Sequence, residues 1–162
     1  MMLCVNHFVR KSQLHFSALR RMVRYIECDE LAALMRSDKV AKKDFIVVDV
    51  RDDDRVGGHI KHSVNMPSGE FLMNVDKLVK ETKEVPLLVF HCALSQVRGP
   101  KAARIYEETR KNILEGDDIP HEVVILRDGF TLFQTKFKNE KDLVEEWDKD
   151  TWEPEWRFIG NS

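Results

Sequence analysis

The sequence contains few cysteines: Cys4, Cys28 and Cys92 are the three among 162 residues. They are widely spaced and form no C-x-x-C pair, which excludes a disulfide framework and is typical of a reducing compartment. The six histidines show no metal-ligand spacing with these cysteines, so we expect no metal site. On this basis the protein is predicted to reside in the cytoplasm and nucleus.

Long apolar runs and a strong excess of one charge are also absent. No apolar run approaches the ~20 residues that a membrane span needs, so we expect no membrane span. The net charge of −2 provides no basic field for nucleic acid, and we expect no nucleic-acid partner. The chain is 43% apolar and 33% charged, the composition of a single globular domain that is long enough to bury a core.

Residues 1–24 differ in composition from the rest of the chain. They are moderately apolar and contain no acidic residue, but they carry Arg10, Lys11, Arg20, Arg21 and Arg24. This pattern is typical of a mitochondrial presequence, so one hypothesis is targeting by residues 1–21. The alternatives are a disordered basic tail and a translation start at Met22. We therefore predict a basic N-terminal extension over residues 1–24.

Strand-like and helical apolar patterns alternate along the rest of the chain. Strands are predicted at 25–26, 45–50, 63–66, 86–91 and 122–126. Helices are predicted over 29–36, about 100–114 and 129–137, and over a stripe of Phe71, Leu72, Val75, Leu78 and Val79 that should face the core. Continuous apolar strands alternating with helices predict an α/β domain with a mostly parallel sheet.

The segment that joins the fourth of these strands to the next helix carries the candidate chemistry. Cys92 follows the strand, and five residues, Ala93, Leu94, Ser95, Gln96 and Val97, separate it from Arg98. A strand, short loop and helix start can surround one point with backbone N–H groups, which suits an oxyanion. That setting favours a reactive thiolate, and an arginine there offers a planar fork of donors. The alternative is that Cys92 is a small core residue.

Three ordered motifs resemble known families. The sequence H-C-x5-R-G-P at 91–100 is similar to the signature of cysteine phosphatases, and in particular of M-phase inducer phosphatases and the related small eukaryotic arsenate reductases. Residues 48–51 with 57–65, and residues 124–130, resemble two signatures of the rhodanese fold. The resemblance implies a rhodanese-like catalytic domain over residues 25–138, with a five-stranded sheet covered by helices on both faces.

The resemblance also suggests roles for residues around the loop. His91, Asp49 and Arg51 would support the catalytic pair Cys92 and Arg98, while His59 would hydrogen bond within the turn at 57–58. The acidic run at 52–54 is interpreted as a solvated loop. The loop lacks the acidic residue of the M-phase inducers, so no general acid is identified. Those enzymes carry a second cysteine where this chain has Val50, so oxidised Cys92 would need an external thiol.

Several functions are compatible with these motifs. The first is a phosphatase acting on phosphotyrosine, phosphoserine, phosphothreonine or aryl phosphates through a phosphocysteine, without a cofactor. The alternative is an arsenate reductase that uses glutathione or glutaredoxin as its electron donor. A thiosulfate sulfurtransferase, whose loop would be one residue shorter, and a non-catalytic rhodanese module are less favoured. Residues 139–162 form an acidic segment with three tryptophans, predicted to pack on the domain, with partner binding as the alternative.

Overall fold

The computed structural model describes residues 24–116 and 119–154. The predicted extension at 1–24 therefore lies outside the described residues, apart from Arg24. Five parallel strands form the main sheet in the order β1-β6-β5-β2-β4, and β3 and β7 form a small antiparallel sheet. The strands are β1 (Arg24–Ile26), β2 (Ile46–Asp49), β3 (His59–Ile60), β4 (Val64–Asn65), β5 (Leu87–His91), β6 (Glu122–Leu126) and β7 (Val144–Glu145).

The central position of β5 explains its apolar sequence. It pairs with β2 on one side and with β6 on the other, so its backbone and both of its faces lie inside the protein. Strands buried on both faces have continuous apolar runs instead of alternating ones. The predicted α/β class with a five-stranded parallel sheet is confirmed. The strands β3 and β7 were not predicted, because two residues are too short to show an apolar periodicity.

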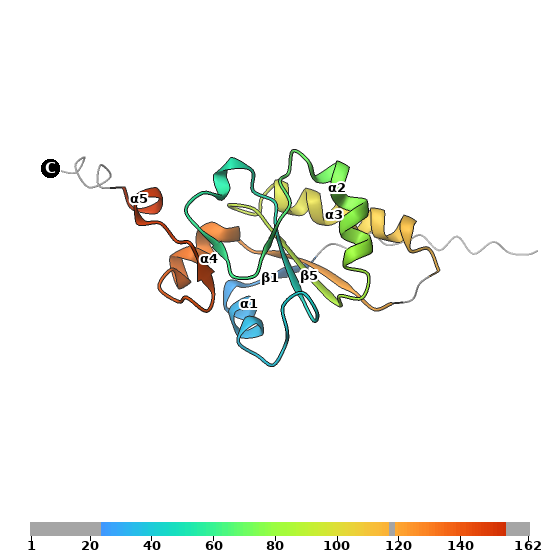
Figure 1. Cartoon of the computed structure of the whole chain (residues 1–162), viewed down its shortest axis with the longest axis horizontal. Helices are drawn as coiled ribbons and strands as arrows, with labels where there is room; N and C mark the ends of the chain where they lie inside the picture. Colours follow the sequence, from blue (N-terminus) through green and yellow to red (C-terminus); the bar gives the residue numbers. More distant parts are fainter. Residues whose placement is uncertain (1–23, 117–118, 155–162) are drawn as a thin grey trace, which may run out of the picture.

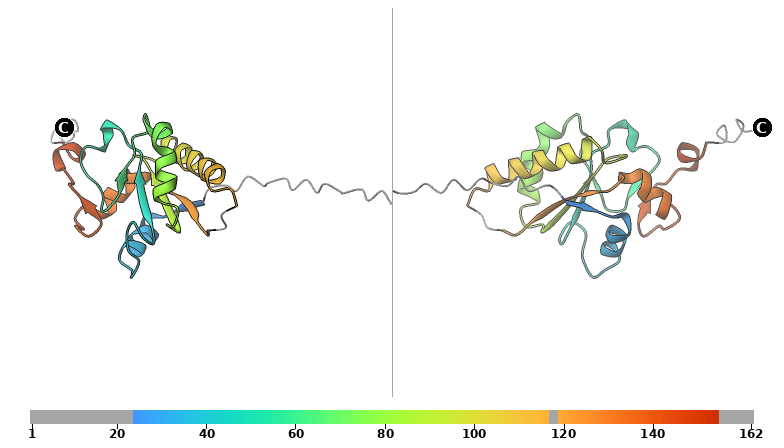
Figure 2. Two further views of the ribbon diagram at one scale, coloured as in Figure 1. Left: turned by 45° about the vertical axis from the view of Figure 1, so that its right-hand side comes forward. Right: turned by 180° about the vertical axis from the view of Figure 1, so that it is seen from behind.

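Helices cover both faces of the main sheet (Figures 1 and 2). The helices α2 and α3 pack over one core cluster, which includes Phe90 and Tyr106, and α1 and α4 pack over a second, which includes Val89 and Phe133. The helices are α1 (Cys28–Met35), α2 (Phe71–Glu81), α3 (Arg98–Ile113), α4 (Gly129–Phe137) and α5 (Lys149–Trp152), with a 3₁₀ turn over Asp53–Arg55. None of these helices is long and apolar enough to cross a membrane, within the residues described.

The predicted inward stripe of α2 is correct except at Leu72. Four of its five residues are buried, but Leu72 is 68% exposed. At 100° per residue Leu72 lies at the edge of the arc that these residues define, and it belongs to the first turn of the helix. The periodicity alone did not show how far the helix end extends beyond the core.

The C-terminal segment is packed on the domain as far as the structure describes it. Leu143 and Val144 are buried in the second core cluster, and β7 pairs with β3. The indole of Trp147 donates to Gln134 Oε1 at 2.9 Å, and that of Trp152 donates to the Gly57 carbonyl at 2.7 Å. The predicted packing of the tryptophans is thus confirmed for these two, while Trp156 lies outside the described residues. Residues on both sides of position 138, the predicted end of the catalytic domain, therefore belong to the same core cluster.

Gly129 starts α4 in a left-handed conformation directly against the candidate loop. Its φ is +59°, and a Cβ at this position would lie 2.4 Å from the carbonyl oxygen of Cys92 and 2.5 Å from that of Ala93. Both atoms belong to the backbone and cannot rotate away. A side chain here would therefore push α4 away from the loop.

We predict that Gly129→Ala lowers the free energy of unfolding by at least ~2 kcal/mol, because left-handed strain and a backbone clash act together. Gly116→Ala is the matched control. Gly116 also has a positive φ, +88°, but a Cβ at this position would meet no atom within 4 Å, so only the conformational cost of about 1 kcal/mol is expected. Urea denaturation of both variants measures the difference, and equal losses would contradict the clash.

Candidate active site

The loop between β5 and α3 folds back on the sulfur of Cys92. The backbone N–H of Ser95 donates to Cys92 Sγ at 3.2 Å, and the Cys92 N–H donates to Ser95 Oγ at 3.4 Å. Ser95 adopts a left-handed conformation with φ of +50°, which produces this tight turn. Cys92 is 4% exposed and Ser95 3% exposed. The two residues therefore form a compact pair at the base of the loop.

The first turn of α4 orients the peptide groups of the loop. Phe130 N donates to the Cys92 carbonyl and Thr131 N to the Ala93 carbonyl, each at 3.0 Å. In a trans peptide the N–H points opposite to the C=O. The N–H groups of Ala93 and Leu94 therefore point away from α4. This is how a loop turns its donors to one side, as oxyanion binding requires.

The N-terminus of α3 adds further donors at the same place. The helix begins at Arg98, and Val97 before it provides no side-chain cap. The first-turn N–H groups of a helix lack intrahelical partners and carry partial positive charge, which attracts anions. The predicted arrangement of strand, loop and helix start is thus present around Cys92. That it binds an oxyanion stays a prediction.

Asp49 and Arg51 form an ion pair that is completely buried below the loop, with 0% exposure for both side chains. Arg51 Nη2 donates to Asp49 Oδ2 at 2.7 Å, and Arg51 Nε donates to Asp49 Oδ1 at 3.0 Å. The same guanidinium donates to the carbonyls of Gly58 at 2.9 Å and Asp54 at 3.3 Å, and stacks 4.2 Å from the centre of the Phe130 ring. The pair therefore joins the end of β2, the following turn and α4.

Burial and neighbouring charges act in opposite directions on these groups. Burial alone would raise the pKa of the Asp49 carboxyl, but the hydrogen bonds and the positive charge of the Arg51 fork lower it below its ordinary value. Burial lowers the pKa of His91, which keeps the imidazole neutral near pH 7. His91 Nδ1 lies 3.2 Å from the Cys92 carbonyl oxygen and 3.9 Å from Asp49 Oδ1. The three residues predicted to support the site therefore meet below Cys92.

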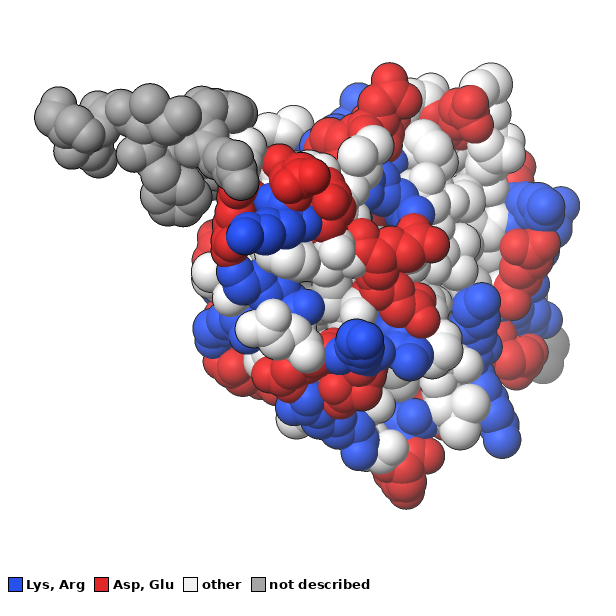
Figure 3. Space-filling model, turned by 60° about the vertical axis from the view of Figure 1, so that its left-hand side comes forward, with Lys and Arg blue, Asp and Glu red and all other residues white. Residues whose placement is uncertain are grey.

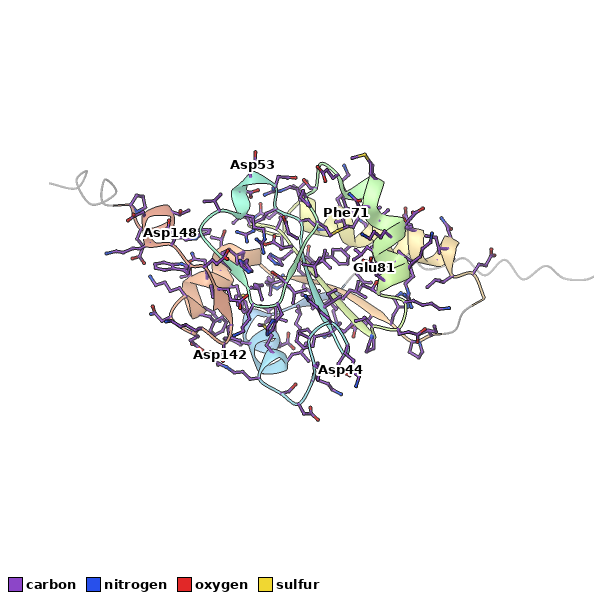
Figure 4. The ribbon with its side chains drawn as sticks, in the orientation of Figure 1. Asp44, Asp53, Phe71, Glu81, Asp142 and Asp148 are labelled. Carbon is purple, nitrogen blue, oxygen red and sulfur yellow. The ribbon has the colours of Figure 1, made fainter. Side chains whose placement is uncertain are left out.

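The guanidinium of Arg98 is held by two carboxylates. Its Nη1 donates to Asp54 Oδ1 at 2.7 Å and to Asp52 Oδ2 at 3.0 Å, and its Nη2 donates to Asp54 Oδ2 at 2.5 Å. The bond from Arg98 lowers the pKa of Asp54, and these bonds in turn raise the pKa of Arg98 further above its ordinary value. The interpretation of the acidic run as a solvated loop is therefore wrong for these two residues. Asp53, between them, is exposed and is not among the partners of Arg98 (Figure 4).

Two residues that the sequence did not single out hold Asp52 in place. Ser68 Oγ donates to Asp52 Oδ2 at 2.6 Å, and Gly69 N donates to Asp52 Oδ1 at 3.0 Å. These bonds lower the pKa of Asp52, with Ser68 contributing most. Ser68 and Gly69 precede α2 and have no motif that marks them in the sequence. The fold alone brings this segment next to Arg98.

The remaining candidates lie away from the loop. Cys28 belongs to the core cluster opposite that of Cys92, donates weakly to the Arg127 carbonyl at 3.8 Å, and has its pKa raised to about 11 by burial. His59 does not bond within the turn at 57–58 as predicted. It lies in β3, where its Nε2 is 3.4 Å from Glu145 Oε2 on the paired strand. In the described ranges no three metal-ligating side chains gather.

Charged side chains of both signs share the surface of the domain. On the face shown in Figure 3, acidic and basic side chains are interspersed. Such a surface forms no broad field of one sign, and any attraction of a charged substrate must come from local groups. The loop amides, the α3 N-terminus and Arg98 are the local groups that suit an anion.

A parallel α/β sheet whose central strand ends in a cysteine loop defines the class of protein as a rhodanese-type domain with a candidate active site. The chain belongs to the rhodanese-like domain family, which it matches over residues 27–136. It is 36% identical over 134 residues to the dual specificity phosphatase Cdc25 of Arabidopsis thaliana, covering 82% of this chain and 86% of that protein. It is 35% identical over 113 residues to arsenate reductase 2.2 of Oryza sativa, covering 69% and 82%.

A solved structure of a yeast protein tyrosine phosphatase of the rhodanese family has the same fold. It superposes with a TM-score of 0.68 at 26% identity, covering 81% of this chain and 97% of that one. The implied rhodanese-like fold is therefore confirmed, together with the resemblance to both groups of enzymes.

We predict that Arg51→Met lowers the free energy of unfolding by ~3–5 kcal/mol, because it leaves the Asp49 carboxylate buried without its partner. Arg24→Met, which removes the exposed pair with Glu122, is the control and should cost less than ~1 kcal/mol. Urea denaturation measures both.

The same pair predicts a pH dependence of stability. The pKa of Asp49 is lower in the folded protein than in the unfolded chain. Its contribution is therefore present above its ordinary pKa and is lost as the pH falls through the lowered folded value. Arg51→Met should flatten this acid limb of the stability curve, and an unchanged limb would contradict the assignment.

Proposed function

We propose that this protein is a cysteine-dependent phosphatase that hydrolyses phosphate monoesters of phosphorylated protein side chains or aryl alcohols. The observation that carries the proposal is the loop in which Ser95 N contacts Cys92 Sγ at 3.2 Å while Arg98 begins the helix that follows. The similarity to a plant dual specificity phosphatase and to a yeast protein tyrosine phosphatase supports the same activity.

In the first step, the Cys92 thiolate attacks phosphorus, an S–P bond forms, and the P–O bond to the leaving group breaks. The leaving oxygen needs a proton as this bond breaks, unless the leaving group is stable as an anion. The N–H groups of the loop and the first turn of α3 would stabilise the charge on the equatorial oxygens. Arg98 would bind two of these oxygens with its planar fork, once a carboxylate has given up that fork.

In the second step, water attacks the phosphocysteine. The S–P bond breaks, inorganic phosphate is released, and the Cys92 thiolate is restored. No electrons are transferred, so this cycle needs neither a cofactor nor a second thiol. The buried pair of Asp49 and Arg51 has no part in the bond changes; it holds the loop in position.

The second candidate function is arsenate reduction, which the similarity to the rice arsenate reductase favours. Arsenate has the shape and charge of phosphate and would occupy the same loop. Its reduction consumes two electrons, which a cysteine pair or an external thiol must supply. Val50 occupies the place next to Asp49, and Cys28 lies in the opposite core cluster. A reductant of the glutathione or glutaredoxin type would therefore be the electron donor and partner.

We predict that Cys92→Ser reduces kcat on p-nitrophenyl phosphate below about a hundredth of the wild-type value, since a hydroxyl is not ionised where a thiolate is needed. Cys28→Ser is the matched control and should leave the activity of the folded protein unchanged. Steady-state assays of the two variants, with thermal midpoints to verify folding, decide the question. Substantial turnover by Cys92→Ser would show that another residue is the nucleophile.

A parallel assay separates the two candidate functions. The purified protein is given p-nitrophenyl phosphate in one reaction, and arsenate with glutathione and glutaredoxin in the other. Arg98→Lys should lower kcat/KM in the productive reaction by at least ~10²-fold, since a point charge cannot replace the bidentate fork. Efficient sulfur transfer from thiosulfate without either activity would contradict both candidates.

A further inference from the structure

The fork that a substrate oxyanion needs is already occupied. Asp54 accepts from both terminal nitrogens of Arg98, at 2.7 and 2.5 Å, in the geometry that a phosphate would adopt. The substrate must therefore take the place of a carboxylate. This inference rests on the proposed phosphatase function and concerns what happens to that carboxylate.

The two carboxylates on Arg98 are not equally free to leave. Asp52 accepts from Ser68 Oγ and Gly69 N as well as from Arg98 Nη1, so it stays anchored when the fork is taken. Asp54 accepts the bidentate pair from Arg98, and its further bond is from the nearby Asp52 N–H at 3.0 Å. It also lies on a short 3₁₀ turn, with 42% of its side chain exposed. Asp54 is therefore the partner that can be exchanged.

When a substrate replaces Asp54 on the Arg98 fork, the charge around the Asp54 carboxylate changes. Arg98 carries one positive charge against the two negative charges of Asp52 and Asp54. A phosphate monoester adds two more negative charges and takes the guanidinium away from Asp54. Arg55 follows on the same turn, and Arg51 donates to the Asp54 carbonyl, but the Asp54 carboxylate loses its bidentate cation and faces Asp52 and a dianion. Like charges at close range favour uptake of a proton.

The first step of the reaction needs a proton for the leaving oxygen. Cys92 must attack as a thiolate. A proton on its sulfur would block the reaction, whereas a proton on a carboxylate would not. The leaving oxygen must be protonated as the P–O bond breaks, and the loop itself has no acidic side chain. The group that releases Arg98 is thus the one that can serve as the acid.

We propose that Asp54 yields the Arg98 fork to the substrate oxyanion, takes up a proton as it does so, and donates that proton to the leaving oxygen. In the first step Cys92 Sγ bonds to phosphorus, the P–O bond breaks, and the Asp54 proton passes to the leaving oxygen, which restores the Asp54 carboxylate. In the second step that carboxylate accepts a proton from the attacking water as the S–P bond breaks. When phosphate leaves, Asp54 releases this proton to solvent and its carboxylate returns to Arg98, which closes the proton balance of the cycle.

The proton uptake is tested by calorimetric titration with sulfate, a tetrahedral dianion that does not itself titrate near neutral pH. The parent is Cys92→Ala, so that the thiol cannot take up the proton. Binding heats at one pH in two buffers of different ionisation enthalpy report the protons taken up. We expect about one proton per sulfate in the parent and none after Asp54→Asn is added, with binding no weaker.

Asp53→Asn in the same parent is the matched control. It removes one negative charge from the same turn, but Asp53 is not among the partners of Arg98 and lies at the outer end of the turn (Figure 4). It should take up the same number of protons as the parent. Proton uptake that persists in Asp54→Asn would overturn the proposal.

The donor step is tested in the protein that retains Cys92. Asp54→Asn should lower kcat/KM on phenyl phosphate, whose leaving group needs a proton, by ~10²–10⁴-fold. The loss on p-nitrophenyl phosphate, whose leaving group is stable as an anion, should be much smaller, and Asp53→Asn should change neither. Equal losses on the two substrates would overturn the donor role. If the wild type hydrolysed neither ester, the phosphatase function and the donor step would fail together, while the sulfate titration would still decide whether Asp54 takes up the proton.

Discussion

The buried ion pair of Asp49 and Arg51 is the contact on which the geometry around Cys92 depends. Asp49 ends β2 beside β5, and the Arg51 guanidinium reaches the carbonyls of Asp54 and Gly58 and the face of Phe130. The turn that carries the partners of Arg98 and the helix that orients the loop carbonyls are thereby tied to one point. A buried pair is expensive to desolvate and is retained only with such complete bonding.

The conformation of the loop also depends on contacts from α4, an element outside the loop. The N–H groups at the start of α4 take the carbonyls of Cys92 and Ala93, which turns the loop donors to the other side. The close approach is possible because Gly129 has no side chain. The site is therefore a product of two helix N-termini, one that holds the backbone of the loop and one, at Arg98, that faces the ligand.

The proposed chemistry depends on how Arg98 is shared. In the structure its charge is balanced by Asp52 and Asp54, so an anion can bind its fork only by displacing a carboxylate. A substrate must compete with a carboxylate that has the same bidentate shape. Competition of this kind favours ligands that carry two negative charges in tetrahedral geometry, which phosphate monoesters and arsenate share.

Local pattern was sufficient for much of this protein. The continuous apolar runs at β2, β5 and β6 marked buried parallel strands, and the spacing from Cys92 to Arg98 marked the loop, because periodicity and motif spacing are properties of neighbouring residues. The tertiary structure alone decided which residues meet across long separations. It placed Asp52 and Asp54 on Arg98, 46 and 44 residues away, and Ser68 and Gly69 on Asp52. The sequence alone could not show that Arg98 pairs with this acidic run. The partner of a charged side chain depends on the chain topology and not on the sequence around it.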